Sequence, residues 1–217
     1  MKELFRKKSK NDISGFSLLE LLVTVAVIGL LTAIVVFNQG DFSDNITLDS
    51  AVTDLELQIR EAQIYGISVR EFQTGTNEFS ASYGVHFDLV SGGGDLTYLF
   101  FADRGVKNGK YDGSISCATG GTNECIKKFN LTKGNTISDV CAIIDLSGTL
   151  KCNSSAAVSK IDIIFNRPNP GPTIKYFNPA GNEVAFPGNQ GAKVTISSPK
   201  GTTRQVYIYT NGQISVQ

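Results

Sequence analysis

The stretch GFSLLELLVTVAVIGLLTAIVVF occupies residues 15–37. From Leu18 onward it is apolar apart from Glu20 and two threonines. That length is about the 20 residues that a helix needs to cross the hydrocarbon core of a bilayer. The run then passes into the polar residues 38–41, without the cleavage site that follows the apolar centre of a secretory signal. We therefore predict a membrane-spanning helix that stays attached to the residues after it.

Charge is distributed unevenly along the 217 residues. Twenty basic and twenty acidic residues cancel, so the whole chain has no electrostatic preference for nucleic acid or for an anionic membrane surface. Residues 1–15 nevertheless have a net charge of +3, from Lys2, Arg6, Lys7, Lys8 and Lys10 against Glu3 and Asp12. Because a basic cluster before an apolar run stays on the cytoplasmic side, the later part of the chain is expected outside the cytoplasm.

Glu20 is the unusual residue of the apolar run. A carboxylate buried in a membrane without a partner is costly, so something must compensate its charge. One interpretation places Glu20 at the interface, among the lipid headgroups. The other gives it a cationic partner, and the residue by itself leaves both open.

The residues Gly15-Phe16-Ser17-Leu18-Leu19-Glu20, preceded by the basic leader, resemble the processing site of type IV prepilins and type II secretion pseudopilins. The resemblance implies that a membrane prepilin peptidase cuts between Gly15 and Phe16 and that Phe16 is then N-methylated. It also implies that Glu20 meets the positive N-terminus of a neighbouring subunit during assembly. Such an ion pair would offset the cost of burying each charge alone.

The rest of the chain changes its hydrophobic period. After the polar residues 38–45, a helical spacing of three or four joins Leu48, Val52, Leu55, Ile59 and Ala62. This amphipathic helix is expected to pack on a head domain and to end near Gly66, as a glycine C-cap. Beyond it the period is two, so we predict an α+β fold with a mostly antiparallel β head. The expected segments are a basic leader 1–15, a membrane helix 16–37, a linker and amphipathic helix 38–66, and a head 67–217.

Several runs have the alternation or the short apolar character of strands. The candidates are residues 83–89, 96–101, 161–165, 192–197 and 205–209, with a hairpin turn at Asn211-Gly212 that returns through residues 214–216. Two packed antiparallel sheets and one curled sheet are both compatible with this pattern.

Four cysteines lie within one short part of the chain: Cys117, Cys125, Cys141 and Cys152. Their spacing is not that of a zinc ribbon, so disulfides and an oxidising compartment are favoured over metal binding. If residues 145–148 form a turn, Cys141 lies opposite Cys152 across a hairpin. Cys117 and Cys125 flank one loop, so 117–125 is the simplest second bridge, although three connectivities are possible.

Few residues offer site chemistry. Asp103, Asn108 and Asp112 could supply oxygen ligands to calcium, but their spacing is not an EF-hand, and an Asn-Gly turn with solvated carboxylates is the favoured interpretation. His86 is the only histidine and is expected on a face of its strand. No nucleophile and base are paired by any motif, so we predict no catalytic residues, no cofactor and no enzyme activity.

Residues 54–69, together with the Asn-Gly loop and the C-terminal hairpin, are most similar to H-type minor pseudopilins and FimT-like minor pilins. The resemblance implies a minor pilin or pseudopilin in a type IV pilus or a type II secretion pseudopilus. The implied partners are the peptidase, other pilin or pseudopilin subunits, and the inner membrane before assembly, with the head later on a cell-surface or periplasmic filament.

Two other functions stay open. The first is a filament-borne binding module for DNA uptake or adhesion. The C-terminal hairpin has no arginine after Gly212, and only Lys193, Lys200 and Arg204 lie nearby in sequence, which weakens the DNA hypothesis. The second is a plain membrane-anchored β domain, which requires that Gly15 is not cut.

Overall fold

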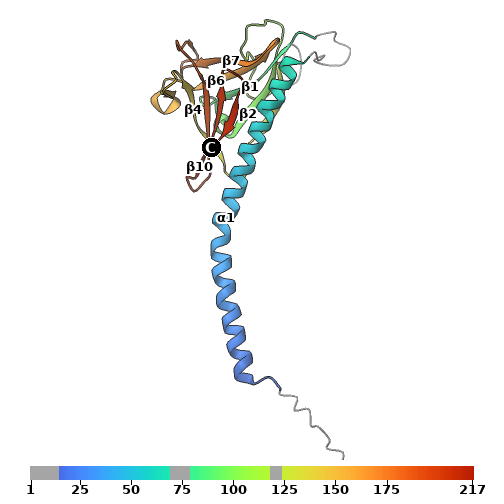
Figure 1. Cartoon of the computed structure of the whole chain (residues 1–217), viewed down its shortest axis with the longest axis vertical. Coiled ribbons are helices and arrows are strands. Elements are labelled where there is room, and N and C mark those ends of the chain that lie inside the picture. The colour runs from blue at the N-terminus through green and yellow to red at the C-terminus, as the bar shows by residue number, and fades with distance from the viewer. Residues whose placement is uncertain (1–14, 69–78, 118–123) are drawn as a thin grey trace, which may run out of the picture. The chain divides into compact units, whose positions relative to one another are not determined.

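The computed structural model describes residues 15–68, 79–117 and 124–217, with the backbone alone for residues 37–42. The chain divides into two units, residues 1–42 and residues 43–217, and we call the second unit the head. One helix, α1 (Leu18–Ile67), contributes to both units. The other elements all belong to the head (Figure 1), so the α+β class predicted from the sequence is confirmed.

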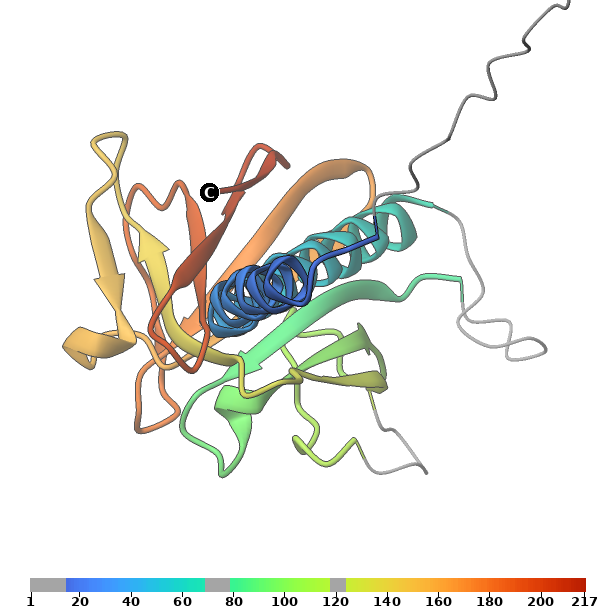
Figure 2. The same cartoon turned by 90° about the horizontal axis from the view of Figure 1, so that it is seen from below.

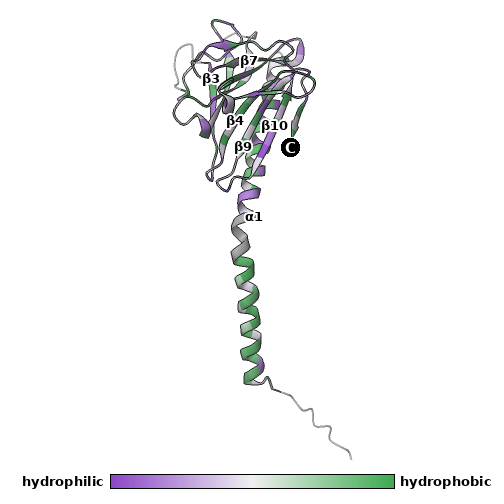
Figure 3. Ribbon diagram, turned by 90° about the vertical axis from the view of Figure 1, so that its left-hand side faces the viewer, coloured by the Kyte–Doolittle hydropathy of each residue, from purple (hydrophilic) through white to green (hydrophobic). Residues whose placement is uncertain are grey.

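The first unit consists of the apolar half of α1. Within the described residues, Leu18–Val36 is the one segment long and apolar enough to cross a membrane, and none of it is buried within the protein. Figure 3 shows this segment in the colour of hydrophobic residues. Residues 38–45 do not interrupt the helix, because their backbone is helical throughout. Polar residues interrupt an apolar pattern but do not by themselves end a helix. Residues 38–45 also contain no proline, which would break one.

The head contains two antiparallel sheets. One has six strands in the order β3-β2-β1-β6-β7-β8, and the other has five in the order β11-β10-β9-β4-β5. The strands of the first sheet are β1 (Ser82–Asp88), β2 (Thr97–Asp103), β3 (Cys125–Asn130), β6 (Lys160–Asn166), β7 (Asn169–Phe177) and β8 (Glu183–Val184). Those of the second are β4 (Thr136–Ile143), β5 (Leu150–Cys152), β9 (Gly191–Ser197), β10 (Thr203–Tyr209) and β11 (Ile214–Val216). Two short 3₁₀ helices, η1 (Gly94–Leu96) and η2 (Asn153–Ser155), complete the described elements.

The C-terminal part of α1 is the centre of the head's core. Its predicted apolar stripe is fully buried, with Leu48, Leu55, Ile59 and Ala62 at 0% exposure. The stripe belongs to one cluster with inward side chains of both sheets, such as Phe87 and Val194. Figure 2 shows this part of the helix, in cyan, lying against strands of both sheets. The amphipathic helix and its packing role are therefore confirmed.

Strand β7 is the main element that the sequence pattern missed. It contains Pro170 and Pro172, which cannot donate a backbone hydrogen bond and normally argue against a strand. The two prolines lie opposite an irregularity in β6, between Ile164 and Asn166, where the ladder is interrupted. Regular pairing begins at Thr173, so the prolines cost β7 little.

Gly66 has a different role from the predicted C-cap. It lies inside α1, which continues to Ile67, and its φ is outside the left-handed region. A side-chain carbon added at Gly66 would lie 2.6 Å from Cβ of Phe165 on β6 and would also meet the Phe165 carbonyl. The glycine is therefore needed because the helix and the sheet come very close there.

Candidate functional site

The predicted processing site lies just before α1. The helix begins at Leu18, so the bond between Gly15 and Phe16 lies outside it in an exposed segment. The first helical hydrogen bond of this region runs from the Leu21 amide to the Ser17 carbonyl, at 3.1 Å. Around Gly15, the described residues leave open space where a side chain would point. Among the described residues, nothing covers this bond, and it lies outside the helix.

Glu20 occupies the first turn of α1 and is exposed. A carboxylate at this position interacts favourably with the positive end of the helix dipole. It is also the only charged residue of the segment Leu18–Val36. A cation that approaches this segment from another chain would therefore find one complementary group, the Glu20 carboxylate.

Both disulfides of the structure join the pairs favoured from the sequence. Cys117 is bonded to Cys125, with 5.3 Å between their Cα atoms, and Cys141 is bonded to Cys152, with 3.9 Å. The second bridge crosses the β4–β5 ladder, in which these two residues are direct partners. All four cysteines of the sequence lie in the described residues and are disulfide-bonded.

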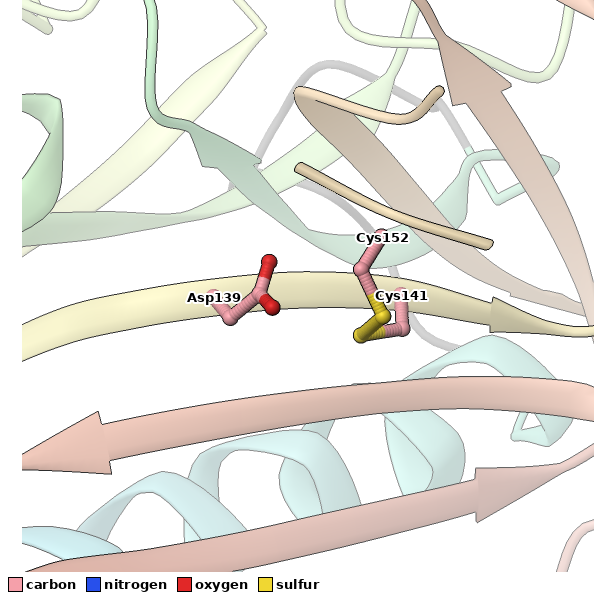
Figure 4. A group of neighbouring side chains, drawn as sticks. All are labelled: Asp139, Cys141 and Cys152. Atoms are coloured by element: carbon pink, nitrogen blue, oxygen red, sulfur yellow. A yellow bond between two sulfur atoms is a disulfide. The ribbon is translucent and has the colours of Figure 1, made fainter. Parts of the chain in front are cut away.

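Asp139 lies beside the second bridge (Figure 4). Its carboxylate and the two sulfur atoms lie within 4.8 Å of one another, the spacing of a metal site. The sulfur atoms are bonded to each other, however, and only a thiolate binds a metal well. The Asp139 carboxylate instead accepts hydrogen bonds from the amide and the hydroxyl of Ser154.

The three calcium candidates lie at the end of β2 and in the loop after it, but their surroundings differ from those predicted. Asp103 is buried rather than solvated, at 3% exposure, and its Oδ2 accepts a hydrogen bond from the Gly109 amide. Asn108 donates to Oδ2 of Asp112, whose side chain is 42% exposed. The solvated-carboxylate interpretation therefore holds for Asp112 and is wrong for Asp103.

Glu124 is the residue of this loop that the sequence did not reveal. Its side chain is buried, and its two oxygens accept hydrogen bonds from the amides of Arg104 and Asp112, at 3.3 and 2.8 Å. Burial raises the pKa of Glu124 to about 7, because the backbone hydrogen bonds only partly offset desolvation and the charges of Asp103 and Asp112 oppose ionisation. Burial raises the pKa of Asp103 as well. Glu124 thus connects two points of the loop, because its carboxylate is hydrogen-bonded to the amides of both Arg104 and Asp112.

A chelator is expected to leave the melting temperature of the protein unchanged. The carboxylates of this loop already accept hydrogen bonds from its backbone, and the raised pKa values of Asp103 and Glu124 favour a proton as the neutralising partner. Thermal unfolding with and without EDTA measures this directly. A fall of more than about 2 °C, restored by added calcium, would contradict the prediction, since a bound ion stabilises the folded state.

Stability is expected to decrease as pH rises from 5 to 8. The unfolded pKa of Glu124 is near 4.5 and the folded pKa is about 7, so the folded state binds more protons between these values. Stability therefore falls with rising pH in this window, by about 2 kcal/mol from this group. Glu124→Gln should lower stability at both pH values and flatten the difference between them. Urea midpoints of both proteins at pH 5 and pH 8 measure this. If the variant lost as much stability between pH 5 and pH 8 as the wild type, a group other than Glu124 would cause the pH dependence.

The basic residues near the C-terminal hairpin are engaged within the head. Arg204 pairs with Asp49 of α1 at 2.8 Å, and Lys200 pairs with Asp44 at 3.1 Å. Lys193 is half-buried on β9. Two of the three cations named for DNA binding thus have acidic partners, which reduces the counterion release that drives phosphate binding.

Comparison with known proteins gives one family model. Residues 10–36 match the prokaryotic N-terminal methylation motif. No curated protein and no solved structure matches the chain. The motif and the apolar helix that it overlaps support a type IV prepilin-like protein, and the family of this motif is structural rather than enzymatic. The motif implies a prepilin peptidase cleavage site and assembly with other pilins, and the apolar helix indicates a membrane anchor.

Proposed function

We propose that the chain is a minor pilin or pseudopilin that is cut between Gly15 and Phe16, methylated on Phe16 and built into a filament. The observation that carries this proposal is the coincidence of two features. The methylation motif covers residues 10–36, and the apolar segment Leu18–Val36 begins three residues after the scissile bond. Cleavage there removes the basic leader and keeps the apolar helix in the mature protein.

Glu20 is the assembly residue of this proposal. After cleavage, Phe16 carries a positive amine in an otherwise apolar region. The amine of one subunit and the Glu20 carboxylate of another satisfy each other, because an ion pair offsets the cost of taking either charge out of water. The same pairing selects one axial offset between neighbouring helices, since only one register brings the two charges together.

The proposed location follows from the leader and the cysteines. The basic residues of the leader keep the N-terminus in the cytoplasm, so the head lies on the other side of the inner membrane and later on a cell-surface or periplasmic filament. Two disulfides in the head agree with an oxidising compartment. DNA binding is not part of the proposal, because Arg204 and Lys200 are paired with acidic residues of α1.

The test is coexpression of the full chain with and without a prepilin peptidase, followed by intact mass measurement and N-terminal sequencing. The proposal predicts a peptidase-dependent chain that starts at methylated Phe16. Glu20→Gln should still be cut but should be missing from sheared filaments of a host that assembles the wild type. An intact Met1 start in the presence of the peptidase, or a cut beyond Phe37, would leave a membrane-anchored β domain instead.

A further inference from the structure

A polar cleft lies on the face of the six-stranded sheet that points away from the main core. On β1, His86 and Asp88 alternate with Val85 and Phe87, which belong to that core. The cleft has a volume of about 390 Å³ and is bounded by β1, β6, β7 and the segment 110–115. This volume is within the range of small-molecule sites.

Three acid–base pairs line the cleft. Nδ1 of His86 lies 2.5 Å from Asp162, Nζ of Lys160 lies 2.8 Å from Asp88, and Nζ of Lys110 lies 3.4 Å from Asp112. The first two pairs are direct cross-strand partners of β1 and β6.

Two of the acids in these pairs are deeply buried. Asp162 is 1% exposed and Asp88 is 4% exposed. Replacing buried ion pairs with apolar residues is often neutral or stabilising, so stability alone is a weak explanation for these charges. Buried ionisable groups beside a cleft are candidates for a functional site.

His86 presents one defined hydrogen-bonding atom to this cleft. Its Nδ1–H donates to Asp162, whose other oxygen accepts from the Tyr111 amide. In the neutral imidazole this bond selects the Nδ1–H tautomer, which leaves Nε2 with a lone pair. Nε2 has no hydrogen-bond partner among the described residues, and His86 lines the cleft. The Tyr111 ring, 4.7 Å from the imidazole, limits rotation of the ring.

We propose that this cleft binds a neutral, hydroxyl-rich ligand, a sugar or short oligosaccharide. The ammonium groups of Lys110 and Lys160 neutralise Asp112 and Asp88. The third carboxylate, Asp162, is 1% exposed and its two oxygens are already engaged by His86 and by the Tyr111 amide, so an ionic ligand gains little from the field of the cleft. The lining offers both kinds of group, with Nε2 of the neutral His86 and Asp112 as acceptors and the ammonium groups of Lys110 and Lys160 as donors. A hydroxyl group both donates and accepts, so a polyol satisfies such a lining, while Tyr111 and Phe177 offer apolar surface to the C–H face of a sugar ring.

The single histidine makes the test specific. The full chain, in lipid nanodiscs without sugar-based detergent, is labelled with ¹⁵N-histidine and titrated with glucose, galactose, N-acetylglucosamine, maltotriose and chitotriose. In the neutral imidazole of the free protein we expect an unprotonated Nε2, and we expect a saturable shift of its resonance with at least one sugar at millimolar concentration. An Nε2–H tautomer, or no shift with any of these sugars at about 50 mM, would overturn the proposal.

Two matched lysine variants separate the cleft from nonspecific effects. Lys110→Ala removes a half-exposed donor at the rim of the cleft and is expected to weaken the binding about tenfold. Lys151→Ala removes an exposed lysine of β5, in the other sheet, and should leave the binding unchanged. Equal affinities in the two variants would place the sugar elsewhere. The proposed site lies in the head alone, so a negative sugar titration would not affect the proposal that the N-terminus is processed.

Discussion

Gly15→Val is expected to reduce cleavage by a prepilin peptidase at least a hundredfold, so that the full-length precursor accumulates in the membrane. A protease must bring its catalytic groups close to the backbone of the scissile bond, and glycine permits that approach because it has no Cβ. A factor of one hundred corresponds to about 2.7 kcal/mol of lost transition-state binding. A Cβ added at Gly15 would have no described heavy atom within 4 Å beyond its chain neighbours, so the structure leaves room for the larger side chain to start. The defect should therefore be confined to processing.

The matched control for this variant is Gly29→Ala. Gly29 also has open space around it in the described structure, and it lies inside the apolar helix instead of at the cut. The Gly29 variant should be processed at the wild-type rate. Intact mass measured at successive times after induction of the peptidase compares the three chains. If Gly15→Val were processed at the wild-type rate, cleavage after Gly15 would be contradicted.

Features set by neighbouring residues could be predicted from the sequence. The processing motif, the apolar run and the amphipathic stripe are local, and each has a period or spacing that one physical cause explains. The β4–β5 hairpin is an example of the same kind. A turn at residues 145–148 requires Cys141 to face Cys152, and the structure has this register. The Gly148 amide donates the hydrogen bond of the turn to the Asp145 carbonyl.

Features set by distant residues could not be predicted in this way. The prolines of β7 argue against a strand, and only the irregular pairing of β6 makes them acceptable. Glu124 precedes a cysteine in a polar stretch, and nothing local indicates that it holds Arg104 and Asp112 by their amides. His86 and Asp162 are far apart in sequence, and pairing of β1 with β6 brings them together. The candidate cleft therefore depends on sheet topology.

Gly66→Ala is expected to lower the free energy of unfolding of the head by about 3 kcal/mol, since overpacking against backbone is not easily relieved. The added methyl group would lie 2.6 Å from Cβ of Phe165, and Phe165 is itself fully buried in the core. Relief would require α1 to move away from β6. That movement would also strain the hydrogen bonds of Gln63 to the carbonyls of Pro170 and Gly212.

The sign of this change distinguishes the two roles considered for Gly66. Alanine is the better helix former by about 1 kcal/mol, so the substitution would stabilise the protein if Gly66 were an ordinary interior residue of a helix. The close approach to β6 predicts destabilisation instead. Gly92→Ala is the control, because Gly92 has open space around it in the described structure and should change stability by less than about 0.5 kcal/mol. Urea unfolding followed by tyrosine fluorescence measures all three chains, and a more stable Gly66→Ala protein would show that α1 and β6 are not in close contact.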